Sequence, residues 1–368
     1  MESLDVKRLF GGVYAGTRVL VTGHTGFKGS WLCLWLRSLG ADVCGLALPA
    51  GTTPAHWPLL ALDIEQRLVD LRDAAAVHAA IDALQPRVVF HLAAQSLVRR
   101  SYQDPVDTFA TNVGGLVNLL EALRVCNSAR AIVNATTDKV YREPPPASGY
   151  AEDHPLGGHD PYSTSKACAE LVSDCWRSSW YQSAGGPRLT TARAGNVIGG
   201  GDWAEDRLVP DLVRAAAAGV PLRIRHPDAV RPWQHVLEPL SGYLRLGQAL
   251  LDDAAVEGAW NFGPAAGSTL SVSALVARMQ AHWPGIAIEA APGPHPREAG
   301  LLVLDGRKAA RELGWQPVWG ADTAIERSIA WYRAFHERGE VSSQVDLDAY
   351  VADARARGDA WACADVTP

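Results

Sequence analysis

A glycine-spaced turn between a β-branched run and an apolar helix constrains this chain more than any other feature. It lies in residues 19–32, VLVTGHTGFKGSWL. Gly23 permits a tight turn, Gly26 lets the backbone approach a pyrophosphate, and Gly29 lets the next helix, expected over residues 30–39, pack on its strand. The helix N-terminus offers free N–H groups and a positive dipole end to the anion. The spacing predicts a dinucleotide-binding unit in an α/β fold.

The chain is longer than one hydrophobic core usually supports, so its 368 residues predict two lobes. We expect a dinucleotide-binding Rossmann domain over residues 1–193, with return segments at about 228–262, and a smaller substrate-binding lobe over residues 194–345. The tail from 346 to 368 has no assignment. The apolar patterns predict a doubly wound parallel sheet of the extended Rossmann type. Further strands are predicted at residues 42–48, 68–71, 88–95, 131–135 and 189–193, and helices at 105–124 and 207–218.

Composition excludes several classes of partner. The net charge is −6, which leaves no basic surplus for nucleic acid or an anionic membrane. No apolar run approaches the roughly 18 residues of a membrane span, and a short polar leader precedes the first strand, so we expect a cytoplasmic protein. The 6 cysteines show no Cys-x-x-Cys pair, which favours reduced thiols over disulfides or a metal site.

The second predicted strand bears on the choice of cofactor. It ends in LALP, residues 46–49, without the acidic residue that usually binds the adenosine ribose and without an arginine for a 2′-phosphate. NAD is therefore favoured over NADP. Asp70 is predicted either to contact the adenine or to cap the next helix. The candidate cofactor-binding residues are Gly23, Thr25, Gly26, Phe27, Lys28, Asp70, Leu71, Leu92, Ala93, Ala94, Thr111, Tyr162 and Lys166.

Three side chains form the set that hydride transfer between an alcohol and a ketone requires. Asp160 and Pro161 predict a helix start, which places Tyr162 and Lys166 four residues apart on one face. Thr137 follows the fifth strand, at the edge where doubly wound sheets bind ligands. Tyr162 can take a hydroxyl proton at neutral pH only if its pKa falls from about 10, and a nearby ammonium lowers that pKa.

Asp138 and Lys139 extend this set toward elimination of water. A ketone acidifies the neighbouring C–H, so an acid and a base at the site can remove water and leave an alkene. Asp138 is the candidate acid for the leaving hydroxyl, and Lys139 is the candidate base. Lys139 can act as a base only if burial and adjacent positive charge lower its pKa from about 10.4. The alternative for this pair is a helix cap and a surface charge.

The second predicted lobe offers groups for a diphosphate. Guanidinium groups bind phosphates in bidentate fashion, and we expect two of the arginines at 207, 223, 225, 231 and 297 to do so. The loop at 195–203 is too glycine-rich to be a mere connection. Asn112, among apolar neighbours, is expected to bridge backbone groups. The candidate substrate-binding residues are Gln95, Ser96, Asn196, Arg207, Arg223, Arg231, His235 and Arg297.

These residues resemble an extended short-chain dehydrogenase/reductase, and within that group the nucleotide-sugar 4,6-dehydratases that act on CDP-glucose. The resemblance spans about residues 18–319, and its general motifs are the glycine turn and the pair Tyr162 and Lys166. Lys139 stands where related dTDP- and GDP-sugar dehydratases usually have glutamate. The more specific motifs are TGHTGFKGSW (22–31), TDK (137–139), GGHDPYS (157–163), AGNVIGGGDW (194–203) and RPWQHVLEPL (231–240).

The resemblance implies a tightly bound NAD and conversion of CDP-glucose to CDP-4-dehydro-6-deoxyglucose. The steps would be C4 oxidation, loss of water across C5 and C6, and hydride return to C6. It also implies a homodimer or homotetramer, a role in deoxysugar supply for polysaccharide, and binding of the nucleotide diphosphate by Asn196 and the arginines around 207 and 231. Val140 in place of cysteine and the proline-rich residues 144–150 depart from the family pattern beside the sugar site.

Two other functions remain open at this point. A nucleotide-sugar 4-epimerase needs the same threonine, tyrosine and lysine, but it does not need Asp138 and Lys139. A non-catalytic dinucleotide-binding sensor on the same fold would tend to lose Tyr162 and Lys166, and this chain has both.

Overall fold

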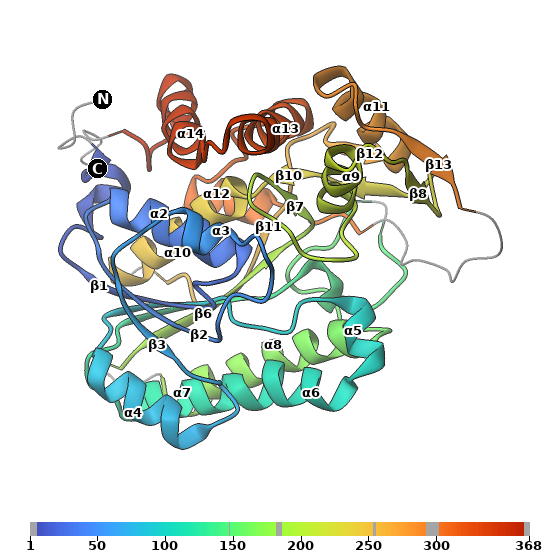
Figure 1. Cartoon of the computed structure of the whole chain (residues 1–368). Coiled ribbons are helices and arrows are strands. Elements are labelled where there is room, and N and C mark those ends of the chain that lie inside the picture. Colours follow the sequence, from blue (N-terminus) through green and yellow to red (C-terminus); the bar gives the residue numbers. More distant parts are fainter. Residues whose placement is uncertain (1–5, 147, 182–185, 253–254, 292–301, 364–368) are drawn as a thin grey trace.

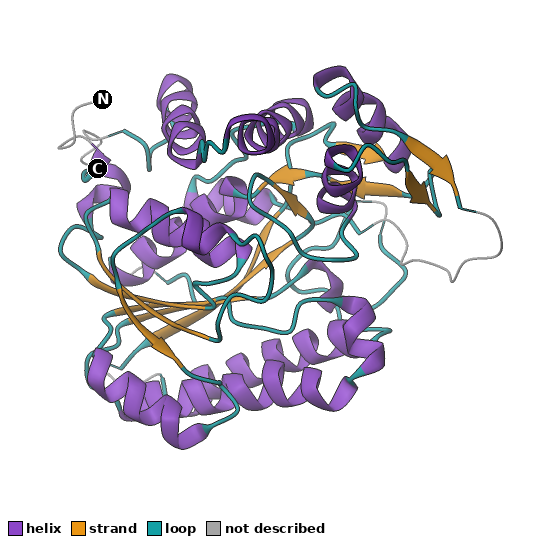
Figure 2. Ribbon diagram, in the orientation of Figure 1, coloured by secondary structure: helices purple, strands orange, loops and turns teal. Residues whose placement is uncertain are grey.

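A seven-stranded parallel sheet forms the centre of the molecule (Figures 1 and 2). The structure, a computed structural model, describes residues 6–146, 148–181, 186–252, 255–291 and 302–363. The strand order runs outward from β1 in both directions, so the predicted doubly wound sheet is confirmed. In spatial order the strands are β11 (Gly258–Phe262), β6 (Arg188–Ala194), β5 (Ala131–Ala135), β4 (Val88–His91), β1 (Arg18–Thr22), β2 (Asp42–Ala47) and β3 (Glu65–Leu68).

Helices cover both faces of this sheet (Figure 1). Successive strand side chains point to opposite faces, so Val19 and Val21 enter one core while Leu20 enters the other. The face of Leu20 is covered by α4 (Ala74–Leu84), α7 (Gly115–Val125) and α8 (Pro161–Ser179), with α5 (Val98–Gln103) and α6 (Pro105–Phe109) alongside. The opposite face carries η1 (Leu9–Gly12), α2 (Phe27–Ser38), α3 (His56–Leu59), α10 (Leu237–Leu251) and α12 (Arg307–Leu313).

A smaller lobe stands at the carboxyl end of the sheet. Its core gathers Trp203 and Trp233 with apolar residues of three helices. The helices are α9 (Leu208–Ala217), α11 (Val272–His282) and α13 (Ala321–Arg338). Its strands pair as β7 (Val197–Ile198) with β10 (Gln234–His235), β9 (Val230–Pro232) with β12 (Thr269–Ser271), and β8 (Leu222–Ile224) with β13 (Ile288–Ala290).

The region after residue 346, to which the sequence analysis assigns no structure, begins within an ordered helix. Helix α14 (Ser343–Arg357) packs on α2, where the Tyr350 ring lies edge-on to Trp35 at 5.7 Å. Beyond it, Trp361 stacks on Phe10 of η1 at 4.9 Å and accepts a hydrogen bond from the Phe10 N–H. Residues near both ends of the chain therefore close over the outer side of α2.

Several predicted elements differ from those observed. Helix α2 begins at Phe27 and not at residue 30, and β4 ends at His91 although a strand was expected over residues 88–95. The third strand was expected at residues 68–71, but β3 covers Glu65–Leu68, because Leu68 is the last residue in register with β2. The helix expected at 105–124 is one helical run from α6 to α7, interrupted by a π-helical turn η2 (Ala110–Gly114). Within the ranges that the structure describes, no helix has the length and apolarity needed to cross a membrane.

The glycine-rich loop after β6 is shaped by close packing. The Trp31 indole donates a hydrogen bond to the carbonyl oxygen of Gly200 at 2.9 Å. A Cβ atom at Gly200 would lie 2.0 Å from the Trp331 ring, so a larger residue does not fit. The loop therefore passes between α2 and α13 and continues to the residues that line the cleft described below.

We predict that Gly200→Ala destabilises the protein by about 3 kcal/mol, the upper part of the usual range for overpacking, since the rigid Trp331 ring cannot yield. Urea unfolding followed by circular dichroism measures this free energy. Gly320→Ala is the matched control, because a Cβ atom there meets nothing within 4 Å. Equal unfolding midpoints for the two variants would contradict this account of the loop.

Candidate active site

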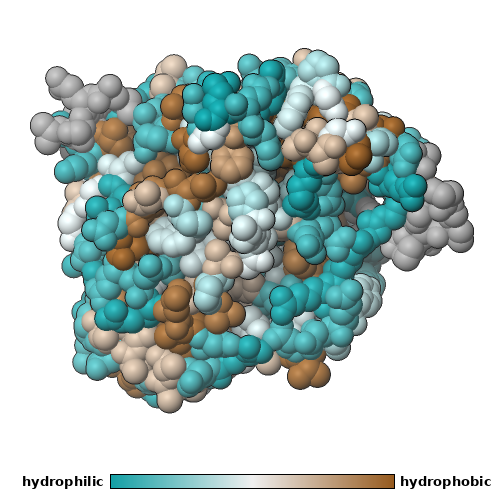
Figure 3. All heavy atoms as spheres, viewed as in Figure 1, coloured by the Kyte–Doolittle hydropathy of each residue, from teal (hydrophilic) through white to brown (hydrophobic). Residues whose placement is uncertain are grey.

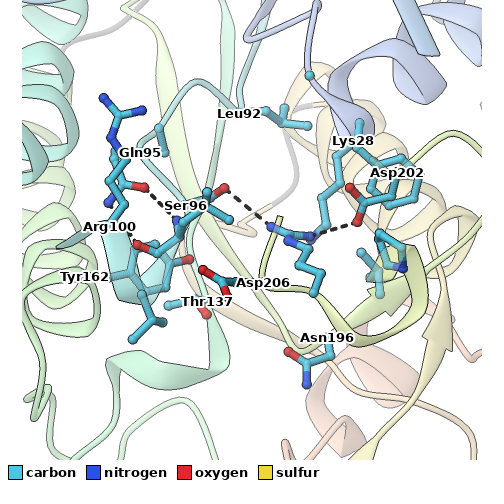
Figure 4. A pocket seen from close by; sticks show the side chains of 18 of the residues that line it. Lys28, Leu92, Gln95, Ser96, Arg100, Thr137, Tyr162, Asn196, Asp202 and Asp206 are labelled. Carbon is cyan, nitrogen blue, oxygen red and sulfur yellow. Dashed lines mark hydrogen bonds and ion pairs between the residues drawn. The ribbon is translucent and has the colours of Figure 1, made fainter. Parts of the chain in front are cut away.

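One cavity of about 770 Å³ lies between the carboxyl edge of the sheet and the smaller lobe (Figure 4). Its wall includes the segments that follow β1, β4, β5 and β6, as expected for a doubly wound fold. Of the candidate site residues, all lie in this wall except His235 and Arg297. Arg297 is outside the residues that the structure describes.

The glycine turn forms the floor of one end of the cavity. Gly23 has φ +73°, and a Cβ atom there would lie 2.8 Å from the Ala93 backbone. A Cβ atom at Gly29 would lie 2.1 Å from the Gly23 carbonyl oxygen, so only glycine allows α2 to start this close to β1. The first helical residue is Phe27, whose end of α2 faces the cavity with free N–H groups. This cradle fits the pyrophosphate of a dinucleotide.

Helix α8 presents Tyr162 and Lys166 to the cavity. Asp160 caps the helix by accepting a hydrogen bond from the Ser163 N–H at 2.9 Å, as the sequence predicts. The Lys166 Nζ donates to the Ala135 carbonyl oxygen at 3.0 Å. Burial lowers the pKa of Lys166 to about 8 against the opposing charge of Glu170.

The phenol of Tyr162 lies among groups that act on its pKa in opposite directions. Burial raises this pKa above its ordinary value, and the Lys139 ammonium and the Thr137 hydroxyl offset part of that rise. Figure 4 shows Tyr162 and Thr137 on the same side of the cavity. The fall of the pKa that Tyr162 needs to act as a base is therefore not present in the chain alone, and the cations that favour it are Lys139 and Arg207.

Asp138 and Lys139 form an ion pair at the start of η3 (Asp138–Val140). The Lys139 Nζ lies 3.1 Å from Asp138 Oδ1, and the Thr137 hydroxyl donates to the same oxygen at 3.0 Å. Burial lowers the pKa of Lys139, but the charge and hydrogen bond of Asp138, together with the charge of Tyr162, outweigh burial and raise the pKa above the ordinary value. The fall of the pKa that Lys139 needs to act as a base is therefore not present in the resting protein, because the adjacent carboxylate stabilises the ammonium form.

Lys28 supplies a further positive charge beside the glycine cradle. It lines the cavity, and among the described residues no carboxylate lies within ion-pair distance of it. Burial and the charges of Arg207, Lys166 and Lys139 lower its pKa to about 7. A bound anion would reverse part of this effect, since it stabilises the charged amine.

A chain of polar contacts crosses the mouth of the cavity. Arg207 lies 3.3 Å from Asp202 through Nη1 and donates to the Ser96 hydroxyl at 3.4 Å through Nη2, which Figure 4 draws as dashed lines. Arg99 and Asp206 form a second ion pair across the same gap. Asp202, Arg99 and Asp206 were missed from the sequence, although Asp202 stands in the glycine-rich motif that was singled out.

The side chains of Gln95, Asn112 and Arg223 are held by contacts within the chain. The Gln95 amide bonds to the Thr108 hydroxyl and the Leu97 backbone, so only part of its side chain is free for a ligand. Asn112 accepts from the Gln95 N–H and donates to its carbonyl oxygen, which confirms its predicted bridging role. Arg223 pairs with Glu289 at 2.6 Å on the exposed rim.

Two expectations require correction. His235 is fully buried, with its ring against Trp31 and Trp319, because the pairing of β10 with β7 turns it into the core. It is not in the cavity wall. Asp70 is in the wall, but it does not cap the next helix: Asp73 does so, while Asp70 accepts hydrogen bonds from Arg72.

Comparisons with known proteins agree with this arrangement. A family model described as GDP-mannose 4,6 dehydratase matches residues 20–328. The CDP-glucose 4,6-dehydratase of Salmonella typhimurium is 46% identical over 336 residues, which are 89% of this chain and 93% of that protein. A dTDP-glucose 4,6-dehydratase of Xanthomonas campestris is 29% identical over 85% of this chain and 92% of that protein.

Solved structures share the fold. UDP-glucose 4-epimerase from Thermus thermophilus, in complex with NAD, superposes with a TM-score of 0.74 and 28% identity over 86% of this chain and 99% of that chain. A dTDP-glucose 4,6-dehydratase from Streptomyces venezuelae with NAD bound has a TM-score of 0.72 and 26% identity over 86% and 97% of the two chains.

We predict that Lys28 takes up a proton when a dinucleotide binds. With a pKa of about 7, Lys28 is mostly neutral at pH 8, and a pyrophosphate beside it favours the charged form. NAD affinity should therefore fall by up to about tenfold from pH 6 to pH 8.5. Calorimetry in two buffers of different ionisation enthalpy measures the proton uptake, which Lys28→Met should reduce. Lys308→Met, a lysine outside the cavity wall, is the control, and equal uptake by wild type and Lys28→Met would refute the assignment.

Proposed function

The chain belongs to the nucleotide-sugar 4,6-dehydratases of the extended short-chain dehydrogenase/reductase type, and on that premise we propose that it converts CDP-glucose to CDP-4-dehydro-6-deoxyglucose with NAD. The observation that carries the proposal is the Asp138–Lys139 ion pair beside Thr137 and Tyr162. It places an acid and a base next to the groups required for alcohol oxidation. The 46% identity to a CDP-glucose 4,6-dehydratase supports the choice of substrate.

The glycine cradle supports NAD as the cofactor, because a Cβ atom at Gly23 or Gly29 would fill it. NAD, when bound, supplies the site that accepts a hydride from the sugar and later returns it. We assign Phe27 and Lys28 to the pyrophosphate, and Lys166 to the ribose hydroxyls beside Tyr162. The residues that end β2 offer no arginine for a 2′-phosphate, which favours NAD over NADP.

Oxidation at C4 needs a group that removes the hydroxyl proton. Tyr162 takes this role, with Thr137 holding the same hydroxyl. The Lys139 ammonium and the Arg207 guanidinium favour the ionised form of the phenol, since each adds positive charge near a developing phenolate. Burial excludes water from the phenol, whose residue is 8% exposed.

Elimination then uses the Asp138–Lys139 pair. One proton moving along the 3.1 Å contact from Lys139 to Asp138 produces a neutral amine and a carboxylic acid together. The amine of Lys139 removes the C5 proton, the C6–O bond breaks, and the Asp138 proton leaves with the hydroxyl as water. Lys139 is then charged and Asp138 ionised, as in the resting protein. Lys139 can return its proton to C5 when hydride reaches C6.

The epimerase alternative is less well supported. Epimerases are among the proteins of similar fold, and they also oxidise a nucleotide sugar. The reaction of an epimerase gives no role to an acid–base pair such as Asp138 and Lys139. A non-catalytic sensor is disfavoured as well, since Tyr162 and Lys166 both line the cavity.

We also propose a cytoplasmic homo-oligomer. The cysteines of the described residues form no disulfide, which suits a reducing compartment. Hydrophilic side chains cover most of the face drawn in Figure 3, with separate apolar patches between them. Large apolar side chains are exposed along α5, α6 and α8, at Tyr102, Val106 and Leu171, which suits contact with a second copy.

The purified protein, given CDP-glucose and catalytic NAD, should release a product lighter by one water with no net NADH. Mass spectrometry and the alkali-induced absorbance of a 4-keto-6-deoxy sugar measure this. dTDP-, UDP- and GDP-glucose serve as controls for the base, and each should react at least about tenfold more slowly. A product of unchanged mass would instead indicate epimerisation.

Lys139→Met should separate the two chemical steps. Loss of the base should slow elimination by about a hundredfold or more. Oxidation should slow by a smaller factor, because Tyr162 loses the charge of Lys139 but keeps that of Arg207, so NADH should still accumulate on the enzyme, detected by its absorbance. Tyr162→Phe is the comparison: it should block oxidation, and no NADH should form. Lys139→Met eliminating water at the wild-type rate would remove Lys139 from the mechanism.

A further inference from the structure

A buried carboxylate behind the cavity has no role in the chemistry described so far. Glu170 lies on α8, one helical turn beyond Lys166, and its side chain is 4% exposed. Its two oxygens accept hydrogen bonds from Arg193 Nε and Nη2 at 2.9 Å each, from Thr136 Oγ1 at 2.5 Å and from Thr191 Oγ1 at 2.6 Å. A carboxylate with this many partners is fixed in position and ionised.

One of these contacts reaches the catalytic segment. Thr136 directly precedes Thr137 and Asp138, and its N–H donates to the Ala192 carbonyl oxygen at 2.9 Å. The bond to Glu170 therefore fixes the side chain of Thr136 where β6 already fixes its backbone. Thr136 is therefore held by both its backbone and its side chain, directly before Thr137 and Asp138.

The charge of Glu170 reaches a second catalytic group. The charged or titratable side chains near Lys166 are Glu170 and Tyr162, each one turn away on its own helix, His91 from β4 and Lys28 from α2. Of these, Glu170 is the carboxylate. Burial lowers the pKa of Lys166, and Glu170 acts against that effect.

Arg193 holds Glu170 from the opposite side. Its guanidinium also donates to the Tyr141 hydroxyl at 2.7 Å and the Glu152 carbonyl oxygen at 3.0 Å. The charges of Glu152 and Lys308 also act near it. Because removal of one partner from a buried ion pair leaves the other unpaired, a neutral Glu170 alone would cost stability, and the test below allows for this.

We propose that Glu170 is a positioning residue of this active site: it anchors Thr136 and so the segment of Thr137 and Asp138, and it holds a fixed negative charge one helical turn from Lys166 on the same face of α8. The inference rests on the proposed function for its effect on turnover. Its effect on Lys166 does not depend on any substrate.

Ionisation of Lys166 can be followed directly. Reductive methylation over a range of pH, with mass spectrometry of the Lys166 peptide, gives the midpoint at which this amine becomes reactive. Glu170→Gln should lower the midpoint by about one pH unit. The double variant Glu170→Gln, Arg193→Gln leaves no unpaired buried charge and should show the same shift. Thr191→Val, which removes one hydrogen bond and keeps the charge, should leave the midpoint unchanged. A wild-type midpoint in the folded Glu170 variants would overturn this part of the proposal.

The anchoring role is tested by Thr136→Val. This variant keeps the charge of Glu170 but loses its bond to Thr136, so kcat for CDP-glucose should fall about tenfold with KM and the Lys166 midpoint unchanged. An unchanged kcat would overturn the anchoring role. Wild-type protein that turns over no nucleotide sugar would refute the proposed function instead, while the methylation result on Lys166 would still stand.

Discussion

Buried positive charge determines the electrostatics of the whole cleft. Cationic side chains converge on one cavity in a chain whose net charge is −6. Several of them are balanced by carboxylates of the same wall, as Lys139 is by Asp138 and Arg207 by Asp202. Lys28 has no such carboxylate within the described residues, so an incoming anion would stabilise its charged form. The fold thus tolerates a local excess of positive charge where anionic ligands would bind.

Helix α8 places the reacting groups on one face because they are spaced at about one helical turn. Tyr162, Lys166 and Glu170 are spaced by four residues and share one face, which turns toward β5 and β6. The first meets the cavity, the second bridges the cavity and the β5 backbone, and the third lies wholly in the core. Over two turns, one face of α8 therefore passes from a residue that lines the cavity to a residue that is buried in the core.

Short motifs carried most of what the sequence could predict. The glycine turn and the Tyr162–Lys166 spacing fix local geometry within a few residues, and the structure places them at one cavity. β3 was misplaced because the polar sequence EQRL forms an exposed edge strand without an apolar pattern. His235 was assigned to substrate although its surroundings come from distant tryptophans. The pKa of Lys139 depends on the orientation of its neighbour's carboxylate, which a residue list does not contain.

The packing of α14 on α2 has a consequence for the order in which the protein is completed. Helix α2, which opens the nucleotide cradle, is among the first elements to leave the ribosome, whereas Tyr350 and Trp361 are among the last. Until they arrive, the Trp35 ring has Phe10 of η1 beside it but lacks Tyr350 and Trp361, although the sheet beneath α2 can already assemble. A nascent chain would therefore expose part of the apolar side of its cofactor helix until α14 and Trp361 are made, and the burial of that side is a late step of folding.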